Sequence, residues 1–196
     1  MPVFWDNRAE NLVFREDAQA LAERLAPEPI DVAYLDPPYN QHPYGSNYHV
    51  LNSVALWDKP PLSKQITRGT KAAIRRDWRT ERRSAYNYRD EAGRAYDRLL
   101  DTIRAHYVLT SYSTDGMIPL EGLLESNVRR GHVTAVMQGY KRYRVSSQRF
   151  SQKPMNVEFV LVLDRHRGSK QSVAELRRTI CRYETEVLDA HPETDA

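Results

Sequence analysis

Hydrophobic positions along the chain follow two different spacings, and the spacing changes several times between the two ends. Five short apolar runs are typical of strands. They cover residues 11–15, 31–35, 106–112, 132–137 and 157–163. Four longer stretches repeat apolar residues at helical intervals. They cover residues 18–26, 88–105, 120–130 and 171–188. Strands that alternate with helices favour an α/β fold with a mostly parallel sheet.

The clearest predicted helix, over residues 88–105, carries its apolar side chains on one stripe, which predicts the face that is buried. The stripe consists of Ala92, Ala95, Tyr96, Leu99, Leu100 and Ile103. The helix over 120–130 is expected to end with Gly131 as its C-terminal cap. The last two apolar runs are expected to pair as antiparallel strands around a long basic connection.

The stretch over residues 40–86 lacks a clear period. We predict a loop over 40–58 with a helical turn around 49–56, and then a mobile basic connection over 63–86. The length of 196 residues fits one domain over 1–188 and a polar tail over 189–196. A single cysteine excludes an internal disulfide framework. Without a long apolar run or a signal peptide, we expect a cytoplasmic protein with no membrane partner.

The net charge of +3 says little about partners, but the distribution of charge says more. Residues 59–104 hold 13 basic and 6 acidic side chains, and residues 140–153 hold five basic side chains and no acid. Basic stretches interleaved with tyrosines are typical of surfaces that bind a phosphate backbone. The alternative is that these arginines lie on solvated helix faces.

The tetrapeptide Asp36-Pro37-Pro38-Tyr39 follows the second predicted strand, where open α/β sheets place a ligand. An exocyclic amine on adenine is a weak nucleophile because its lone pair is delocalised into the ring. The Asp36 carboxylate and the Pro37 carbonyl can each accept one of the two N–H bonds, which frees the lone pair for attack. The prolines stiffen the turn, and Tyr39 can stack on a base swung out of the helix. The alternative is an ordinary turn at the end of a strand.

At these residues the chain resembles adenine-specific DNA N6-methyltransferases, in particular the Dam-like alpha group with a D-P-P-Y motif. The resemblance extends from about residue 11 to about residue 163 and includes YLDPPYNQHPYGSNYHVLNSVALWDKP, VLTSYS, GYKRYR and KPMNVEFVLVL. It implies a Rossmann-like methyltransferase sheet that ends in an antiparallel strand pair. It also implies methyl transfer from S-adenosylmethionine to adenine N6 in double-stranded DNA.

The resemblance assigns roles to individual residues. Asp36, Pro37 and Tyr39 would bind the target base and its amine, and Asp36 would also face the cofactor. Asp17, with Ala18 beside it, matches the acidic position that contacts the adenine of S-adenosylmethionine. The alternative for Asp17 is that it only caps the helix that begins at Ala18, and both roles are compatible.

Two further sets of residues are expected to contact DNA. The loop after the motif would face the flipped base through Tyr44, Asn47, Tyr48 and His49, although each of these side chains could instead pack under the loop. The basic connection would contact phosphates, which position an enzyme without reading sequence. Its candidate residues are Lys141, Arg142, Tyr143, Arg144, Arg149 and Lys153.

One family feature is missing from this sequence, namely an early glycine-rich loop of the type F-x-G-x-G that approaches the cofactor. The eight glycines all follow Asp36, and no two of them form G-x-G. The first two strands of the family sheet are therefore expected to lie outside this chain. We then expect S-adenosylmethionine to bind this chain alone weakly or not at all.

Three explanations remain open for the missing loop. The chain is the C-terminal part of a split enzyme with a separate N-terminal fragment, a truncated product, or a DNA-binding relative that has lost catalysis. Methylation of an amine in RNA or protein is a further alternative. A restriction endonuclease is the expected partner of a site-specific enzyme of this kind.

Overall fold

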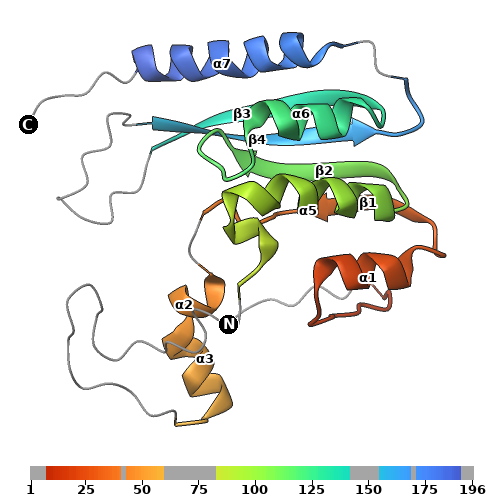
Figure 1. Ribbon diagram of the computed structural model, residues 1–196, viewed down its shortest axis with the longest axis vertical. Helices are drawn as coiled ribbons and strands as arrows, with labels where there is room; N and C mark the ends of the chain where they lie inside the picture. Colours follow the sequence, from red (N-terminus) through yellow and green to blue (C-terminus); the bar gives the residue numbers. More distant parts are fainter. Residues whose placement is uncertain (1–7, 41–42, 60–82, 142–154, 169–170, 191–196) are drawn as a thin grey trace, which may run out of the picture.

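The computed structural model describes residues 8–40, 43–59, 83–141, 155–168 and 171–190. Its centre is a four-stranded sheet in the order β1-β2-β4-β3 (Figure 1). The strands are β1 (Ile30–Leu35), β2 (Ala105–Ser113), β3 (His132–Lys141) and β4 (Met155–Asp164). The helices α1 (Ala18–Leu25), α5 (Arg89–Thr102), α6 (Leu120–Val128) and α7 (Val173–Ala190) accompany the sheet. The predicted α/β class is confirmed.

The sheet is mixed, because β4 lies between β2 and β3. β1 runs parallel to β2, whereas β4 is antiparallel to both of its neighbours. The predicted antiparallel pair of the last two strands is confirmed, and both strands are longer than predicted. The expected mostly parallel sheet is confirmed among the described strands, because β1, β2 and β3 run in the same direction and only β4 is reversed.

One face of the sheet carries the hydrophobic core. Along β4, Val157, Phe159, Leu161 and Leu163 are buried and alternate with less buried residues, as the two-residue period of a strand requires. They pack in one cluster with buried residues of α5, α6 and α7. The predicted stripe on α5 is confirmed, since Ala92, Ala95, Tyr96, Leu99 and Leu100 are all buried.

The opposite face of the sheet carries exposed apolar side chains. Val32 and Tyr34 on β1 are 53% and 60% exposed, and Val136 on β3 is 64% exposed. The register places Val32 opposite Tyr107, which is 37% exposed, so these residues lie on the same face. In the part of the chain that the structure describes, this face therefore holds apolar surface in contact with solvent. We call Val32, Tyr34, Tyr107 and Val136 the open face.

Several predicted boundaries are wrong, each for a physical reason. Residues 11–15 form no strand, because no described strand pairs with them, and Leu12 and Val13 are 64% and 95% exposed. α5 ends at Thr102 rather than at residue 105, because Ile103 is extended. α7 continues to Ala190, past the predicted end at 188.

Gly131 does not have the predicted role of a left-handed C-terminal cap. α6 ends at Val128, and its C-cap is the right-handed Arg129. A Cβ atom at position 131 would lie 2.2 Å from the backbone oxygen of Asp164, so the close approach of the backbone requires glycine.

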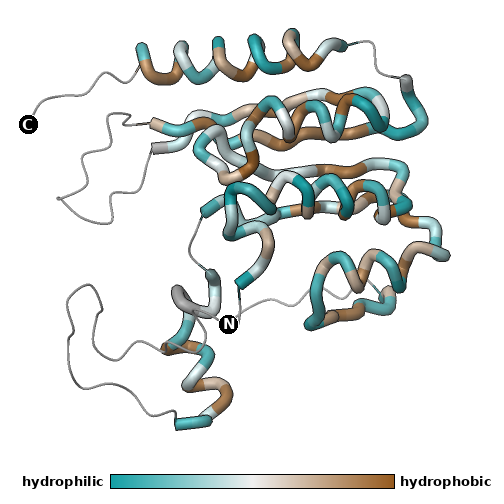
Figure 2. The backbone as a smooth tube through the Cα atoms, viewed as in Figure 1, coloured by the Kyte–Doolittle hydropathy of each residue, from teal (hydrophilic) through white to brown (hydrophobic). Residues whose placement is uncertain are grey.

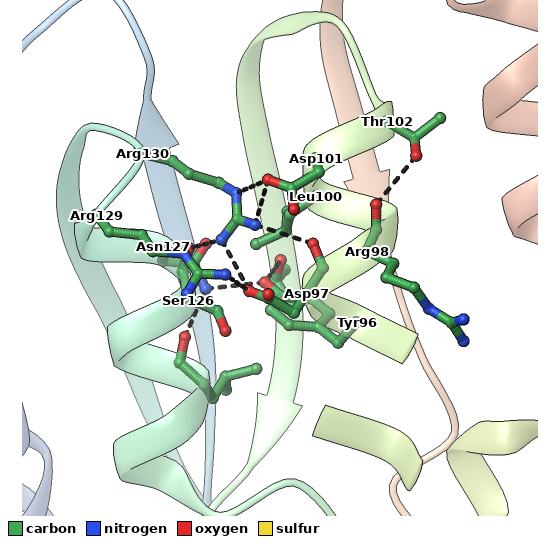
Figure 3. A network of polar contacts seen from close by, with 12 residues as sticks. Tyr96, Asp97, Arg98, Leu100, Asp101, Thr102, Ser126, Asn127, Arg129 and Arg130 are labelled. Atoms are coloured by element: carbon green, nitrogen blue, oxygen red, sulfur yellow. Dashed lines mark hydrogen bonds and ion pairs between the residues drawn. The ribbon is translucent and has the colours of Figure 1, made fainter. Parts of the chain in front are cut away.

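Polar contacts join α5, α6 and β2 beneath the sheet surface (Figure 3). The Tyr96 hydroxyl shares a hydrogen bond of 2.7 Å with Thr110 and accepts one of 2.9 Å from Asn127 Nδ2. Nearby, the Arg130 guanidinium donates to the Asp97 and Asp101 carboxylates at 2.9 and 3.0 Å. These bonds connect the three elements to one another.

The helices α2 (Tyr44–Asn47) and α3 (His49–Leu56) extend away from the sheet (Figure 1). The predicted helical turn around 49–56 is confirmed, whereas α2 was not predicted. α3 buries none of its residues although it is rich in apolar side chains (Figure 2). Among the described helices, none is long and apolar enough to cross a lipid bilayer.

Candidate functional site

The tetrapeptide Asp36-Pro37-Pro38-Tyr39 begins directly after β1, at the carboxyl end of that strand. Asp36 is exposed, Pro37 is buried and Tyr39 is 40% exposed. The buried proline has a fixed φ angle, so it anchors the turn while the carboxylate before it and the ring after it stay accessible. The structure thus presents one acceptor and one stacking surface side by side along the chain.

Two residues from other strands lie at the same end of the sheet as the tetrapeptide. Because β4 is antiparallel to β2, its amino end meets the carboxyl ends of β1 and β2. The pKa of the Tyr39 phenol is raised above its usual range. Burial is the largest cause, followed by the charge of Glu158 and then by Tyr44, Asp36 and Tyr140. Tyr39 is therefore a neutral phenol at physiological pH, and Glu158 and Tyr140 belong to its surroundings.

Sequence reasoning missed Glu158 as a site residue. The sequence does contain a signal for this residue, because Glu158 is the one charged residue in the apolar run MNVEFVLVL. A charge that interrupts such a run lies on the less buried face of the strand, and Glu158 is exposed.

A second missed residue, Asn87, holds the segment that follows Tyr39. Its side chain donates from Nδ2 to the backbone oxygen of Asn40 at 3.0 Å, across 47 residues of sequence. Asn87 is the last residue of the short 3-10 helix η1 (Ala85–Asn87) and is 7% exposed. The local signal is the capping pattern Ser84-x-x-Asn87, which predicts a turn but not its distant partner.

The loop after the motif contains four predicted DNA-contacting residues. The rings of Tyr44 and Tyr48 stack at 5.8 Å between centroids, and they are 54% and 50% exposed. His49 is half-buried at the start of α3. The backbone of Asn47 lies in α2, and its side chain is outside the described part.

The basic connection between β3 and β4 begins and ends at the same edge of the sheet. Lys141 is the last residue of β3, with its side chain outside the described part. The remaining predicted phosphate contacts also lie outside the described residues, namely Arg142, Tyr143, Arg144, Arg149 and Lys153. Where the chain returns, Asn156 donates to Ser113 Oγ at 2.6 Å and accepts from Thr114 Oγ1 at 2.9 Å. These bonds fix the return point beside β2.

Asp17 is the N-cap of α1, as the structural alternative predicted. Its Oδ1 accepts from the backbone N–H groups of Gln19 and Ala20 at 2.9 and 3.2 Å. The nearby hydroxyl of Tyr86 is buried and has no hydrogen-bond partner among the described residues. The pKa of Tyr86 is raised. Burial is the largest cause, followed by Tyr96 and then by Asp17.

The residues around Asp17 fit only part of S-adenosylmethionine. A carboxylate with Ala18 beside it suits the adenine end of that molecule. The amino-acid end needs backbone N–H groups at a close approach, and the sequence contains no G-x-G segment to provide them.

A shallow depression on α7 lies along Glu175, Arg178, Thr179 and Arg182. A single helix supplies all four residues, and the depression includes none of the predicted site residues.

The chain is similar to known DNA methyltransferases. Residues 4–109 match the family of D12 class N6 adenine-specific DNA methyltransferases. The chain is 31% identical over 148 residues to the type II methyltransferase M.FokI of Planomicrobium okeanokoites, which covers 76% of this chain and 21% of that protein. It is 30% identical over 132 residues to the type II methyltransferase M.NlaIII of Neisseria lactamica, with 67% of this chain and 36% of that protein covered.

The modification methylase StsI of Streptococcus sanguinis is 34% identical over 119 residues, which is 61% of this chain and 16% of that protein. This chain therefore spans about a third or less of the length of these relatives. No solved structure matches it. Because the family match covers more than half of the sequence and includes the Asp-Pro-Pro-Tyr segment, the chain belongs to the D12 class N6 adenine-specific DNA methyltransferases.

Proposed function

We propose that this chain is the target-binding part of a site-specific DNA methyltransferase that acts on adenine N6. The position of Asp36 and Tyr39 at the carboxyl end of β1 carries the proposal. The carboxylate is exposed and the ring is 40% exposed, and the buried Pro37 lies between them in the sequence. An accessible acceptor next to an accessible ring suits an unpaired planar base.

In the proposed reaction, the Asp36 carboxylate and the Pro37 carbonyl accept the two N–H bonds of the adenine amine. When bound, S-adenosylmethionine would supply an electrophilic methyl group, whose bond to sulfur breaks as the bond to nitrogen forms, so that S-adenosylhomocysteine leaves. As the N–C bond forms, the amine becomes acidic and loses one proton, which Asp36 is positioned to accept. Tyr39 stacks on the base, and its raised pKa keeps the ring uncharged.

The proposed DNA contacts use the residues predicted from the sequence. Tyr44, Asn47, Tyr48 and His49 would lie near the flipped base. Double-stranded DNA would be held through its phosphates by Lys141, Arg142, Tyr143, Arg144, Arg149 and Lys153, so binding should weaken as salt rises. The names of the relatives describe modification methylases, which suggests a restriction endonuclease as the counterpart of this enzyme.

The proposed enzyme also needs a glycine-rich cofactor loop, carried either in frame with this sequence or on a separate polypeptide. Asp17, Ala18 and Asp36 would contact the cofactor from this chain, whereas the loop would contact its amino-acid end. The open face is apolar, and one edge of β1 has no paired strand among the described strands. These two surfaces would contact the part that carries the loop.

The test is methyl transfer by the chain together with such a polypeptide. The coding sequence immediately upstream of the gene is searched for an F-x-G-x-G segment, in frame or adjacent, and the product of that segment is co-expressed with this chain. We expect tritiated methyl groups to reach adenine in DNA with both products and not with either alone. Labelling of RNA or protein instead of DNA would contradict the proposal.

A second candidate function is DNA binding without catalysis. The absence of G-x-G from the 196-residue sequence favours it. DNA binding without methyl transfer, in the presence of every adjacent glycine-rich product, would select this candidate.

A further inference from the structure

We propose that Asn87 is a positioning residue for the target base, because its side chain fixes the backbone that follows Tyr39. The inference rests on the proposed function, in which Tyr39 stacks on an unpaired base. Asn87 does not touch that base itself. It acts through the backbone of Asn40.

Both ends of the Asn87 amide are engaged. Nδ2 donates to the Asn40 backbone oxygen at 3.0 Å, and Oδ1 accepts from the backbone N–H of Ser84 at 3.1 Å. The side chain is 7% exposed, so little water competes for these bonds. An unpaired amide at this position would be costly, and the Asn40 segment is therefore held in one place.

The anchor at the other end is rigid. η1 is closed by the Asn87 N–H bond to the Ser84 oxygen at 2.9 Å and leads directly into α5. Ala92 and Tyr96, on α5, are fully buried in the core. Asn87 thus connects the hydrophobic core to the segment after the motif.

The neighbouring sequence restricts the backbone on only one side of Tyr39. Pro37 and Pro38 restrict the backbone before Tyr39, whereas the residue directly after it is Asn40 and the next proline is Pro43. The ring is 40% exposed, so the groups that face it, among them Glu158 and Tyr140, cover only part of it. The orientation of the ring therefore depends on the next backbone position, and that position is the one that Asn87 binds.

Two matched variants separate positioning from local folding. In Asn87→Asp, one carboxylate oxygen can still accept from Ser84, but the donor to Asn40 becomes an acceptor. In Ser84→Ala, the cap on the Tyr86 N–H at 3.3 Å is lost while the Asn87–Asn40 bond remains. Asn87→Ser serves as a second test variant, because serine favours caps and is too short to reach Asn40.

The readout is photo-crosslinking of the full chain to a single-stranded oligothymidine that carries one 5-iodouracil. This probe offers an unpaired base and requires no recognition sequence. The yield at Tyr39 is mapped by mass spectrometry at saturation, and the affinity is measured separately by fluorescence anisotropy. We expect Asn87→Asp and Asn87→Ser to lower the yield at Tyr39 by about threefold or more with little change in affinity. Ser84→Ala should crosslink as the wild type does.

Acidification supplies a signature that a purely structural role would not produce. Burial raises the pKa of the introduced carboxyl, so it binds a proton in mildly acidic solution and can again donate to Asn40. The Asn87→Asp yield should recover between about pH 8 and about pH 5.5, while the Asn87→Ser yield stays low. Wild-type yield in both folded variants at both pH values would overturn the inference.

Tyr39→Ala distinguishes this failure from failure of the proposed function. If the wild type forms no crosslink at Tyr39, the stacking role is wrong and the inference falls with it. If Tyr39 crosslinks but the Asn87 variants do so equally well, only the positioning role is wrong. Loss of the mapped crosslink in Tyr39→Ala, with binding retained, verifies that the signal reports this ring.

Discussion

At the scale of single residues, the candidate site combines a local motif with partners that are distant in sequence. Asp36 and Tyr39 could be predicted, because an acceptor and a ring after a strand form a local pattern. Glu158 and Asn87 could not, because the pairing of β4 and the bond to Asn40 depend on the folded chain. The position of Asp17 was predicted together with its capping alternative, and the structure confirms the cap.

The first prediction at this scale concerns Asp36. Asp36→Ala should lower methyl transfer to adenine by about 10²–10³, because a transition-state acceptor is lost. Binding to DNA should change by less than about twofold, since the phosphate contacts are unaffected. Initial rates of tritium transfer are measured with the complemented enzyme. Asp31→Ala, an exposed change on β1, the strand before Asp36, is the control and should keep the wild-type rate. An Asp36→Ala rate close to that of the control would exclude the proposed role of the carboxylate.

At the scale of elements, the sequence predicted those helices and strands whose own apolar period settles their burial. The stripe on α5 is an example, because all five of its helical members are buried. The failures arise where a distant partner decides the conformation. Residues 11–15 have the composition of a strand but no described strand beside them, and Gly131 is required by the Asp164 backbone rather than by α6.

The contact between α5 and α6 should depend on Arg130 and hardly on Arg129. The Arg130 side chain is 9% exposed and bonds to Asp97 and Asp101, whereas that of Arg129 is 54% exposed. Arg130→Ala should lower the free energy of unfolding by about 2–3 kcal/mol, because the hydrogen bonds from its nearly buried guanidinium to Asp97 and Asp101 are lost. Arg129→Ala should lower it by less than about 1 kcal/mol. Denaturation in urea measures both.

The same network predicts a dependence on pH. Burial alone would raise the pKa of Asp97, but hydrogen bonds from Arg130, Ser126 and Arg129 outweigh it and lower that pKa. A carboxyl with a lowered folded pKa stabilises the protein above its unfolded pKa, and this stabilisation is lost as pH falls through the folded value. The difference in unfolding free energy between the wild type and Arg130→Ala should therefore narrow below about pH 4. A difference that is unchanged in acid would show that the Asp97 charge does not contribute.

At the scale of the whole molecule, the sheet has one face packed on a core and one open face. The chain spans 36% of one relative and less of two others, so those relatives contain much sequence with no counterpart here. We expect the chain alone to show no saturable calorimetric signal with micromolar S-adenosylmethionine, because it lacks the G-x-G loop. The complemented pair should bind it. Saturable binding by the chain alone would place the whole cofactor site within these residues.

The open face gives the last prediction, on Val32→Lys. Val32 is 53% exposed in this chain, so a lysine there should change the unfolding free energy of the chain alone by less than about 0.5 kcal/mol. If the glycine-loop polypeptide covers this face, the same lysine would be buried without a partner in the complex, at a cost of several kcal/mol. Copurification and methyl transfer should therefore both be lost in Val32→Lys, although the chain itself stays folded. Thr179→Lys, an exposed change on α7, should preserve both. A complex that forms equally well with Val32→Lys would mean that its partner binds elsewhere, and the apolar surface around Val32 and Tyr34 would then require a different occupant.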